Sequence, residues 1–127
     1  MEKTNFENLR VYQLAEQLAD VIWDITCTWN SFARDTLGRQ LVRAADSIGA
    51  NIAEGSGRGS DADYRRFLRM ARGSLYETQH WLRRAYKRRL LTQEQVNVLL
   101  PVIRELTPTL NAYLRSIGTL AKKTLAV

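Results

Sequence analysis

The chain has 127 residues and a formal net charge of +6 at pH 7, and its length is that of one ordinary domain. A hydrophobic content of 45% and a charged content of 25% are globular averages, and they exclude disordered, collagen-like and low-complexity classes. One cysteine and one histidine exclude an intramolecular disulfide and the multi-cysteine or paired-histidine metal sites, so we expect a single domain over residues 1–127 without metal or cofactor.

Two amphipathic helices are predicted in the first half of the chain, because apolar residues recur there at alternating spacings of four and three. The first is expected from Leu9 to about Thr28. Its apolar stripe consists of Val11, Ala15, Leu18, Ile22, Ile25 and Trp29. The second is expected from Leu37 to Glu54. Its stripe consists of Leu37, Leu41, Ala45, Ile48 and Ile52.

Two further helices are predicted after a glycine-rich break at residues 55–59. Ser60 is a suitable N-cap for the third, which is expected to run to about Arg89. Its stripe consists of Tyr64, Leu68, Ala71, Leu75, Thr78, Leu82 and Ala85. A capping box of Thr92 and Gln95 begins the fourth. Its stripe consists of Val96, Leu99, Ile103, Leu106, Leu110, Tyr113, Ile117 and Leu120.

The expected fold class is all-α, an antiparallel up-down-up-down four-helix bundle, because four amphipathic helices follow one another with short connections. Pro101 and Pro108 lie inside the fourth helix, so we expect it to bend near its prolines. Four large aromatic residues lie off the apolar stripes: Trp23, Phe32, Tyr76 and Trp81. They indicate either an outer surface that acts as an interface or side chains wrapped round the edge of the core.

Positive charge is concentrated between Arg58 and Arg89, a segment that contains ten basic and three acidic residues. On a helical wheel, one narrow sector of the third helix lies away from its apolar stripe and is therefore expected to be exposed. It holds a basic ridge of Arg65, Arg69, Arg72, Arg83 and Lys87, with Tyr76, Gln79 and His80 in the gap. Arginine can grip phosphate with two parallel hydrogen bonds, and Tyr76 could stack on an unpaired base. The ridge therefore predicts binding of RNA or DNA. A solvated helix face and a site for an acidic protein partner are the alternatives.

Polar side chains share one face of the second helix beside its apolar stripe: Gln40, Arg43, Ser47, Asn51 and Glu54. Short polar groups of this kind suit a partly buried hydrogen-bond network. Arg43 could pair with Glu54 or with Glu77 of the third helix, within one chain or across a subunit boundary. A structural polar motif and a binding site remain open alternatives.

Catalytic and metal motifs are weak. The loop of residues 55–60 fits an interhelical turn better than a phosphate cradle, because Asp61 and Asp63 would repel phosphate from the following helix. Glu77 and His80 form only half of a di-iron bundle motif. No serine or cysteine has a credible base beside it. We therefore expect no catalytic residues and no metal ligands, and the protein is expected not to be an enzyme.

The segment QLVRAADSIGANIAEGSGR, residues 40–58, closely resembles the signature of the four-helix bundle proteins encoded in intervening sequences of bacterial 23S rRNA genes. This family also includes accessory proteins of diversity-generating retroelements. FENLRVYQLAEQLADVI, residues 6–22, and YRRFLRMARGSLYETQHWL, residues 64–82, resemble its first and third helices. The resemblance implies a non-catalytic, ring-like homo-oligomer, commonly a pentamer. Its retroelement branch implies binding of RNA and a reverse transcriptase through a basic surface.

No apolar run approaches the roughly 18 residues of a membrane span, and residues 1–10 lack a hydrophobic signal core. We therefore expect a cytoplasmic protein without membrane contact, and the family resemblance implies that it is bacterial. The leading interpretation is a non-enzymatic, oligomeric bundle that binds nucleic acid through the basic ridge. The alternative is an adaptor oligomer that binds a protein partner, such as a nucleic-acid-processing enzyme, and makes no direct contact with nucleic acid.

Overall fold

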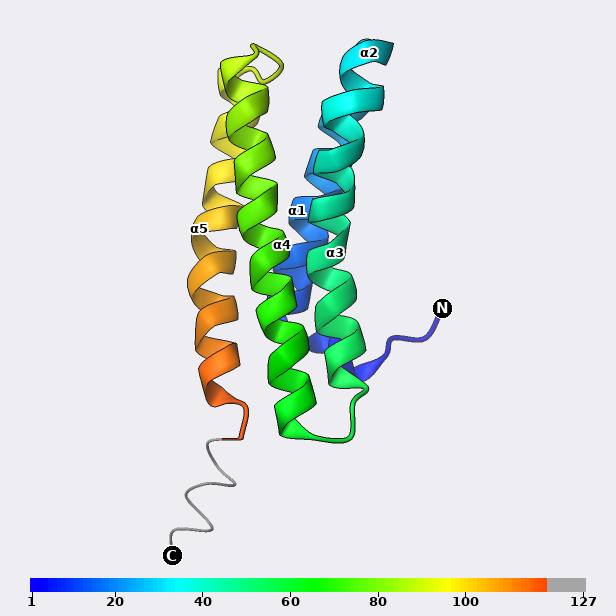
Figure 1. Ribbon diagram of the computed structural model, residues 1–127, viewed down its shortest axis with the longest axis vertical. Coiled ribbons are helices and arrows are strands. Elements are labelled where there is room, and N and C mark those ends of the chain that lie inside the picture. The colour runs from blue at the N-terminus through cyan, green and yellow to red at the C-terminus, as the bar shows by residue number, and fades with distance from the viewer. Residues whose placement is uncertain (119–127) are drawn as a thin grey trace, which may run out of the picture.

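The computed structural model describes residues 1–118, and its long helices lie side by side (Figure 1). They are α1 (Arg10–Cys27), α3 (Arg39–Ser56), α4 (Asp61–Lys87) and α5 (Gln93–Ser116). A 3-10 turn (Asn5–Asn8) precedes α1, and the short helix α2 (Ser31–Ala33) continues through a π-helical segment (Arg34–Gly38) into α3. Residues 1–118 contain no strand, so the expected all-α four-helix bundle is confirmed.

The helices occupy the four corners of a bundle. Helix α1 packs against α3 and α5, and α4 packs against the same two helices. Helices α1 and α4 therefore lie at opposite corners. In Figure 1 the chain ascends in α1, descends in α3, ascends in α4 and descends in α5, with the α3–α4 connection at the bottom and the α4–α5 connection at the top.

The predicted apolar stripes form the core. Every stripe residue of the first two predicted helices is buried, and so is every one of the third except Tyr64, which is half-buried. Along α5 the stripe is buried from Leu99 to Leu110, while Val96, Tyr113 and Ile117 are half-buried. Leu120 lies outside the described residues. The helical period of the sequence was therefore sufficient to predict the inward face of each helix.

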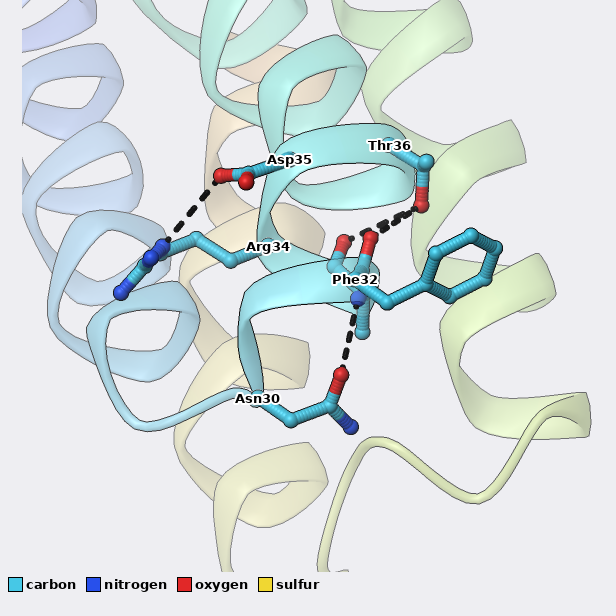
Figure 2. Close-up of polar contacts among 6 residues, drawn as sticks. Asn30, Phe32, Arg34, Asp35 and Thr36 are labelled. Carbon is cyan, nitrogen blue, oxygen red and sulfur yellow. Dashed lines mark hydrogen bonds and ion pairs between the residues drawn. The ribbon is translucent and has the colours of Figure 1, made fainter.

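The second helical segment begins earlier than Leu37, the residue predicted from periodicity. Asn30 is its N-cap, and the Asn30 side-chain oxygen accepts a hydrogen bond of 3.0 Å from the backbone N–H of Ala33 (Figure 2). The π-helical segment that follows has wider turns than an α-helix, so it interrupts the regular apolar spacing. For that reason the spacing could not be followed back to Ser31.

Both predicted caps are present. The Ser60 hydroxyl accepts a hydrogen bond from the N–H of Asp63 at 3.2 Å, and Thr92 and Gln95 form the reciprocal capping box. Helix α5 continues without a break through Pro101 and Pro108. The bend expected near these prolines stays a prediction.

The end of α4 is closed by Arg89 in a left-handed backbone conformation, with φ of 62°. The N–H of Leu90 bonds to the carbonyl of Ala85 at 2.9 Å, and the N–H of Arg89 bonds to that of Tyr86 at 3.1 Å, the hydrogen-bond pattern of a Schellman cap. A side chain at this φ is strained, whereas glycine adopts it freely.

Replacing Arg89 with glycine is therefore expected to raise the free energy of unfolding by about 1 kcal/mol, measured by urea denaturation. Arg88→Gly is the matched control, because Arg88 has an ordinary φ of −87°. Glycine at this position is expected to lower the free energy of unfolding, since it adds freedom to the unfolded chain. Equal effects at the two positions would contradict the strain at Arg89.

Candidate nucleic-acid interface

The basic ridge of α4 lies along the border between α4 and α5. An Nη1 donor of Arg65 bonds to the carbonyl oxygen of Ile117 at 2.9 Å, and Arg72 Nη1 donates to Asn111 Oδ1 at 3.4 Å. Both arginines are half-buried. The expectation that the whole ridge is exposed is therefore wrong for these two residues, because the sector that turns away from the stripe of α4 turns toward α5.

A tyrosine pair adds a third tie between α4 and α5 at the same end of the bundle. The hydroxyls of Tyr64 and Tyr113 share a hydrogen bond of 2.6 Å, and their rings meet edge to face. Burial and this hydrogen bond raise the pKa of the Tyr64 phenol well above its usual value. The Tyr64 phenol therefore stays neutral, and its hydrogen bond to Tyr113 helps to hold the two helices in a defined register.

The other ridge residues are exposed and carry uncompensated charge. Arg69, Arg83 and Lys87 are exposed, and Tyr76, which lies between them, is 53% exposed to solvent. Ion pairs within residues 1–118 involve other bases: Arg10 with Glu105, Arg34 with Asp35, Arg58 with Glu54, and Arg66 with Asp63. No ridge residue therefore forms an ion pair with a carboxylate of residues 1–118.

Helix α5 supplies a further base to this surface. Residues seven apart lie about two turns apart on the same side of a helix. Arg72 of α4 contacts Asn111 of α5, and the two helices run in opposite directions (Figure 1). Seven residues forward from Arg72 is Gln79, and seven residues back from Asn111 is Arg104. Arg104 therefore lies across from Gln79. Arg104 is exposed and fills the interval that the ridge leaves between Arg72 and Arg83. Analysis of one helix at a time missed it.

We use the name basic seam for this set of side chains along the α4–α5 border: Arg65, Arg69, Arg72, Arg83 and Lys87 of α4 with Arg104 of α5. Toward the α4–α5 connection, the seam borders an apolar groove of about 400 Å³ between the two helices. Leu82, Leu99, Leu100 and Ile103 line it, and Arg83 and Lys87 contribute charged side chains. The surface thus combines fixed positive charge with an open apolar groove at one end.

A small group of acidic residues lies on the side of the bundle away from the seam. Helix α1, at the corner opposite α4, carries Glu16 and Asp20 on its exposed surface, and Asp46 of α3 lies close to Asp20. Burial and the negative charge of Asp20 raise the pKa of the Asp46 carboxyl. A polyanion would therefore be attracted to one side of the molecule and repelled from the other.

The raised pKa of Asp46 predicts a pH-dependent effect of Asp46→Asn. A carboxyl whose pKa rises on folding destabilises the folded state when it is ionised, and this cost disappears as the pH falls below its unfolded pKa. Because Asp46 is exposed, the variant is expected to gain only about a few tenths of a kcal/mol at pH 7, and nothing at pH 3. Urea denaturation at both pH values measures this, and a gain of the same size at pH 3 would contradict it.

The polar motif of α3 forms hydrogen bonds mainly within its own helix. The Ser47 hydroxyl donates to the carbonyl of Arg43 at 2.7 Å, and the Asn51 amide donates to that of Ser47 at 2.9 Å, as short polar side chains do when they reach the preceding turn. Glu54 pairs with Arg58 at 2.9 Å. The predicted pairing of Arg43 with Glu54 or Glu77 inside one chain is therefore wrong, and a pairing across a subunit boundary stays a prediction.

Two of the remaining bases have a structural role around Phe67. The guanidinium groups of Arg58 and Arg66 lie 4.6 and 4.7 Å from the centre of its ring, and each is also paired with a carboxylate. Arg58 thereby fixes the glycine-rich loop against α4. These two arginines are not part of the basic seam.

Of the four aromatic residues off the apolar stripes, Trp23, Phe32 and Tyr76 are exposed, whereas Trp81 is half-buried and packs against the core, as the second alternative predicted. The ring of His80 lies against Trp81 with centroids 4.7 Å apart. In the described part of the chain, no three His, Cys, Asp or Glu side chains converge to hold a metal ion. The same residues contain no helix that is both long and apolar enough to cross a bilayer.

Comparison with known proteins adds a family and a fold. A family model described as 23S rRNA-intervening sequence protein matches residues 7–112. Among solved structures, the chain is similar to a crystallised protein of unknown function from the S23 ribosomal protein family of Bacteroides thetaiotaomicron. The TM-score is 0.73 at 24% identity, and the match covers 84% of this chain and 96% of the other, which supports the fold. No curated protein matches the chain significantly.

Proposed function

Because the chain belongs to the family of 23S rRNA-intervening sequence proteins, as its resemblance predicted, we propose that it acts without catalysis and binds RNA or DNA through the basic seam. The observation that carries this proposal is the row of bases along α4 and α5 that form no ion pair with a carboxylate within residues 1–118. Phosphate backbones are the polyanions that such a row suits best.

The contacts of Arg65 and Arg72 support the proposal, because they hold these side chains in place without using their charge. Each donates one hydrogen bond to a neutral oxygen in or at the end of α5, the carbonyl of Ile117 or the amide oxygen of Asn111, so the positive charge of the guanidinium stays available to an anion. A positioned arginine loses less conformational freedom on binding phosphate than a free one. Arg69, Arg83 and Arg104 add exposed forks at intervals along the same surface.

This surface is expected to contact phosphate groups and to show little preference for base sequence. Binding through the backbone carries little sequence information, since discrimination between bases needs contacts with their edges. Tyr76, which is 53% exposed beside the seam, could stack on an unpaired base. We therefore expect a preference for single-stranded or looped nucleic acid over a perfect duplex.

The experiment is a salt series of fluorescence anisotropy with labelled single-stranded RNA, hairpin RNA and duplex DNA. Six basic side chains predict that the logarithm of the binding constant falls with the logarithm of salt concentration with a slope of up to about −4 to −5. Absence of binding to all three at about 50 mM salt would overturn the proposal and favour the adaptor alternative, in which the seam attracts an acidic protein.

We propose in addition that the chain forms a homo-oligomer, with a ring of five as the specific expectation from the family resemblance. The aromatic side chain of Phe32, which is 79% exposed, supports association, because a large apolar ring is costly to leave in water. A ring would repeat the seam around its outside and raise affinity for a long nucleic acid without a new kind of contact. Light scattering at micromolar concentration that returned the mass of one chain would overturn it.

A further inference from the structure

The groove between α4 and α5 is open because the hydrogen bonds that connect these two helices all lie at the other end of the helix pair. Within residues 1–118, the hydrogen bonds between the two helices involve Tyr64, Arg65 and Arg72 of α4, all before Gln79. Beyond Gln79, toward the α4–α5 connection, aliphatic side chains line a space of about 400 Å³ that the chain itself does not fill. That size is within the range of sites that accept a large apolar group.

Phe32 is a large apolar group that its own chain leaves outside. It is 79% exposed, more than any other aromatic residue among residues 1–118. The turn that carries it is well ordered by local hydrogen bonds: Asn30 caps the helix start, and the Thr36 hydroxyl donates to the carbonyl of Phe32 at 2.7 Å. Figure 2 shows the ring projecting away from this turn. Phe32 is thus presented in a fixed place.

Phe32 and the groove lie at the same end of the bundle. The indole N–H of Trp29 donates to the carbonyl of Leu90 at 2.9 Å, which joins the α1–α2 corner to the α4–α5 connection. Figure 1 shows α2 and this connection together at the top. Phe32 is not one of the groove-lining residues, so it does not fill the groove of its own chain.

The charges beside the two features are complementary. Asp35 is exposed three residues after Phe32, and its carboxylate has only a 3.5 Å contact with Arg34. Arg83 and Lys87 line the groove and have no acidic partner within residues 1–118. A second copy of this chain therefore offers both an aromatic ring for the groove and a carboxylate for the bases at its edge.

We propose that Phe32 of one copy docks into the α4–α5 groove of the next copy, with Asp35 beside Arg83 and Lys87, and that the other four residues of the basic seam stay accessible to nucleic acid. The two contact surfaces are different, so the pairing is head-to-tail and each copy can bind one neighbour on either side. Because both surfaces lie at the same end of the bundle, neighbouring copies are not displaced from one another along the bundle axis. This arrangement favours a closed ring over a filament. This inference rests on the proposed self-association and identifies its contact.

Light scattering of complementary variants tests this pairing. Phe32→Ser removes the ring and Leu100→Asp places a carboxylate in the groove wall, so each variant alone is expected to be a monomer. When they are mixed, one intact ring meets one intact groove, and a heterodimer of two chains is the expected product. Trp23→Ser, which removes another exposed aromatic ring, is the matched control and should keep the wild-type mass.

Cysteine cross-linking gives a second measurement that does not depend on Leu100→Asp remaining folded. In a Cys27→Ser background, Phe32→Cys and Leu100→Cys variants are expected to form a disulfide-linked dimer on oxidation only when the two are mixed. A wild-type oligomer that persists with Phe32→Ser, or that dissociates with Trp23→Ser instead, overturns the docking contact and leaves self-association standing. A monomeric wild type overturns both, while the nucleic-acid assay reports on the seam separately.

Discussion

Replacing Arg69 and Arg104 together with glutamate is expected to weaken binding of single-stranded RNA about a hundredfold to a thousandfold at 100 mM salt, because two phosphate contacts become repulsions. The salt dependence should become shallower by about 1.4 units of slope, since on a single strand each lost contact releases about 0.7 fewer counterions. Both residues are exposed and neither lines the groove, so helicity, stability and oligomer mass should stay unchanged.

The matched control for this variant is Lys3→Glu with Arg39→Glu. Both wild-type residues are exposed, both lie outside the basic seam, and the change in net charge is the same. We expect this control to lower affinity only slightly, as a distant change in net charge does in a screened solution. Equal losses in the two double variants, measured by anisotropy in the same buffer, would show that overall charge governs binding and would contradict a role for the seam.

Arg65 and Arg72 are excluded from this test because they connect α4 to α5. Glutamate at either position would place a carboxylate against the carbonyl of Ile117 or the amide oxygen of Asn111. If such a variant lost binding, a lost phosphate contact and a changed α4–α5 register would both explain the result. The exposed seam residues separate these two effects.

Gly55→Ala is expected to lower the free energy of unfolding by about 1–3 kcal/mol, although alanine is the better helix former. A Cβ atom at Gly55 would lie 2.8 Å from the Cβ of Phe67 and 3.1 Å from Cδ1 of Tyr64. Both neighbours belong to α4, and the Cβ of Phe67 is fixed to the backbone, so relief of the contact requires the two helices to move apart. Urea denaturation measures the loss.

Gly73→Ala is the matched substitution at an open position. Gly73 lies inside α4, is exposed, and has no heavy atom within 4 Å of the place where its Cβ would be. The helix propensity of alanine should therefore raise stability there by about 0.5–1 kcal/mol. Opposite signs at the two glycines are the expected result, and stabilisation at both would contradict the close approach of α3 and α4 at Gly55.

Local pattern was enough to predict the fold and the inward faces of the helices. The recurrence of apolar residues fixed which side of each helix is buried, and the caps at Ser60 and Thr92 depend on residues only three positions apart. The motif of residues 40–58 indicated the family. These features were predictable because each is decided within a few turns of one helix.

The candidate site was only partly predictable, because a helical wheel shows which residues share a face but not what that face meets. It grouped Arg65, Arg69, Arg72, Arg83 and Lys87 correctly along one side of α4. It did not show that Arg65 and Arg72 donate to α5, or that Arg104 joins them from there. The register between α4 and α5 depends on packing across the bundle, and neither helix carries that information alone.

The sequence by itself determined which residues face the core and where the positive charge is concentrated, since both follow from periodicity along one chain. Tertiary structure alone decided the partners of the polar side chains. Glu54 pairs with Arg58 of the next loop instead of Arg43, and Trp29 reaches the carbonyl of Leu90, which is 61 residues away in sequence. Such partners depend on helix spacing, on the π-helical segment before α3, and on which groups the packed core leaves within reach.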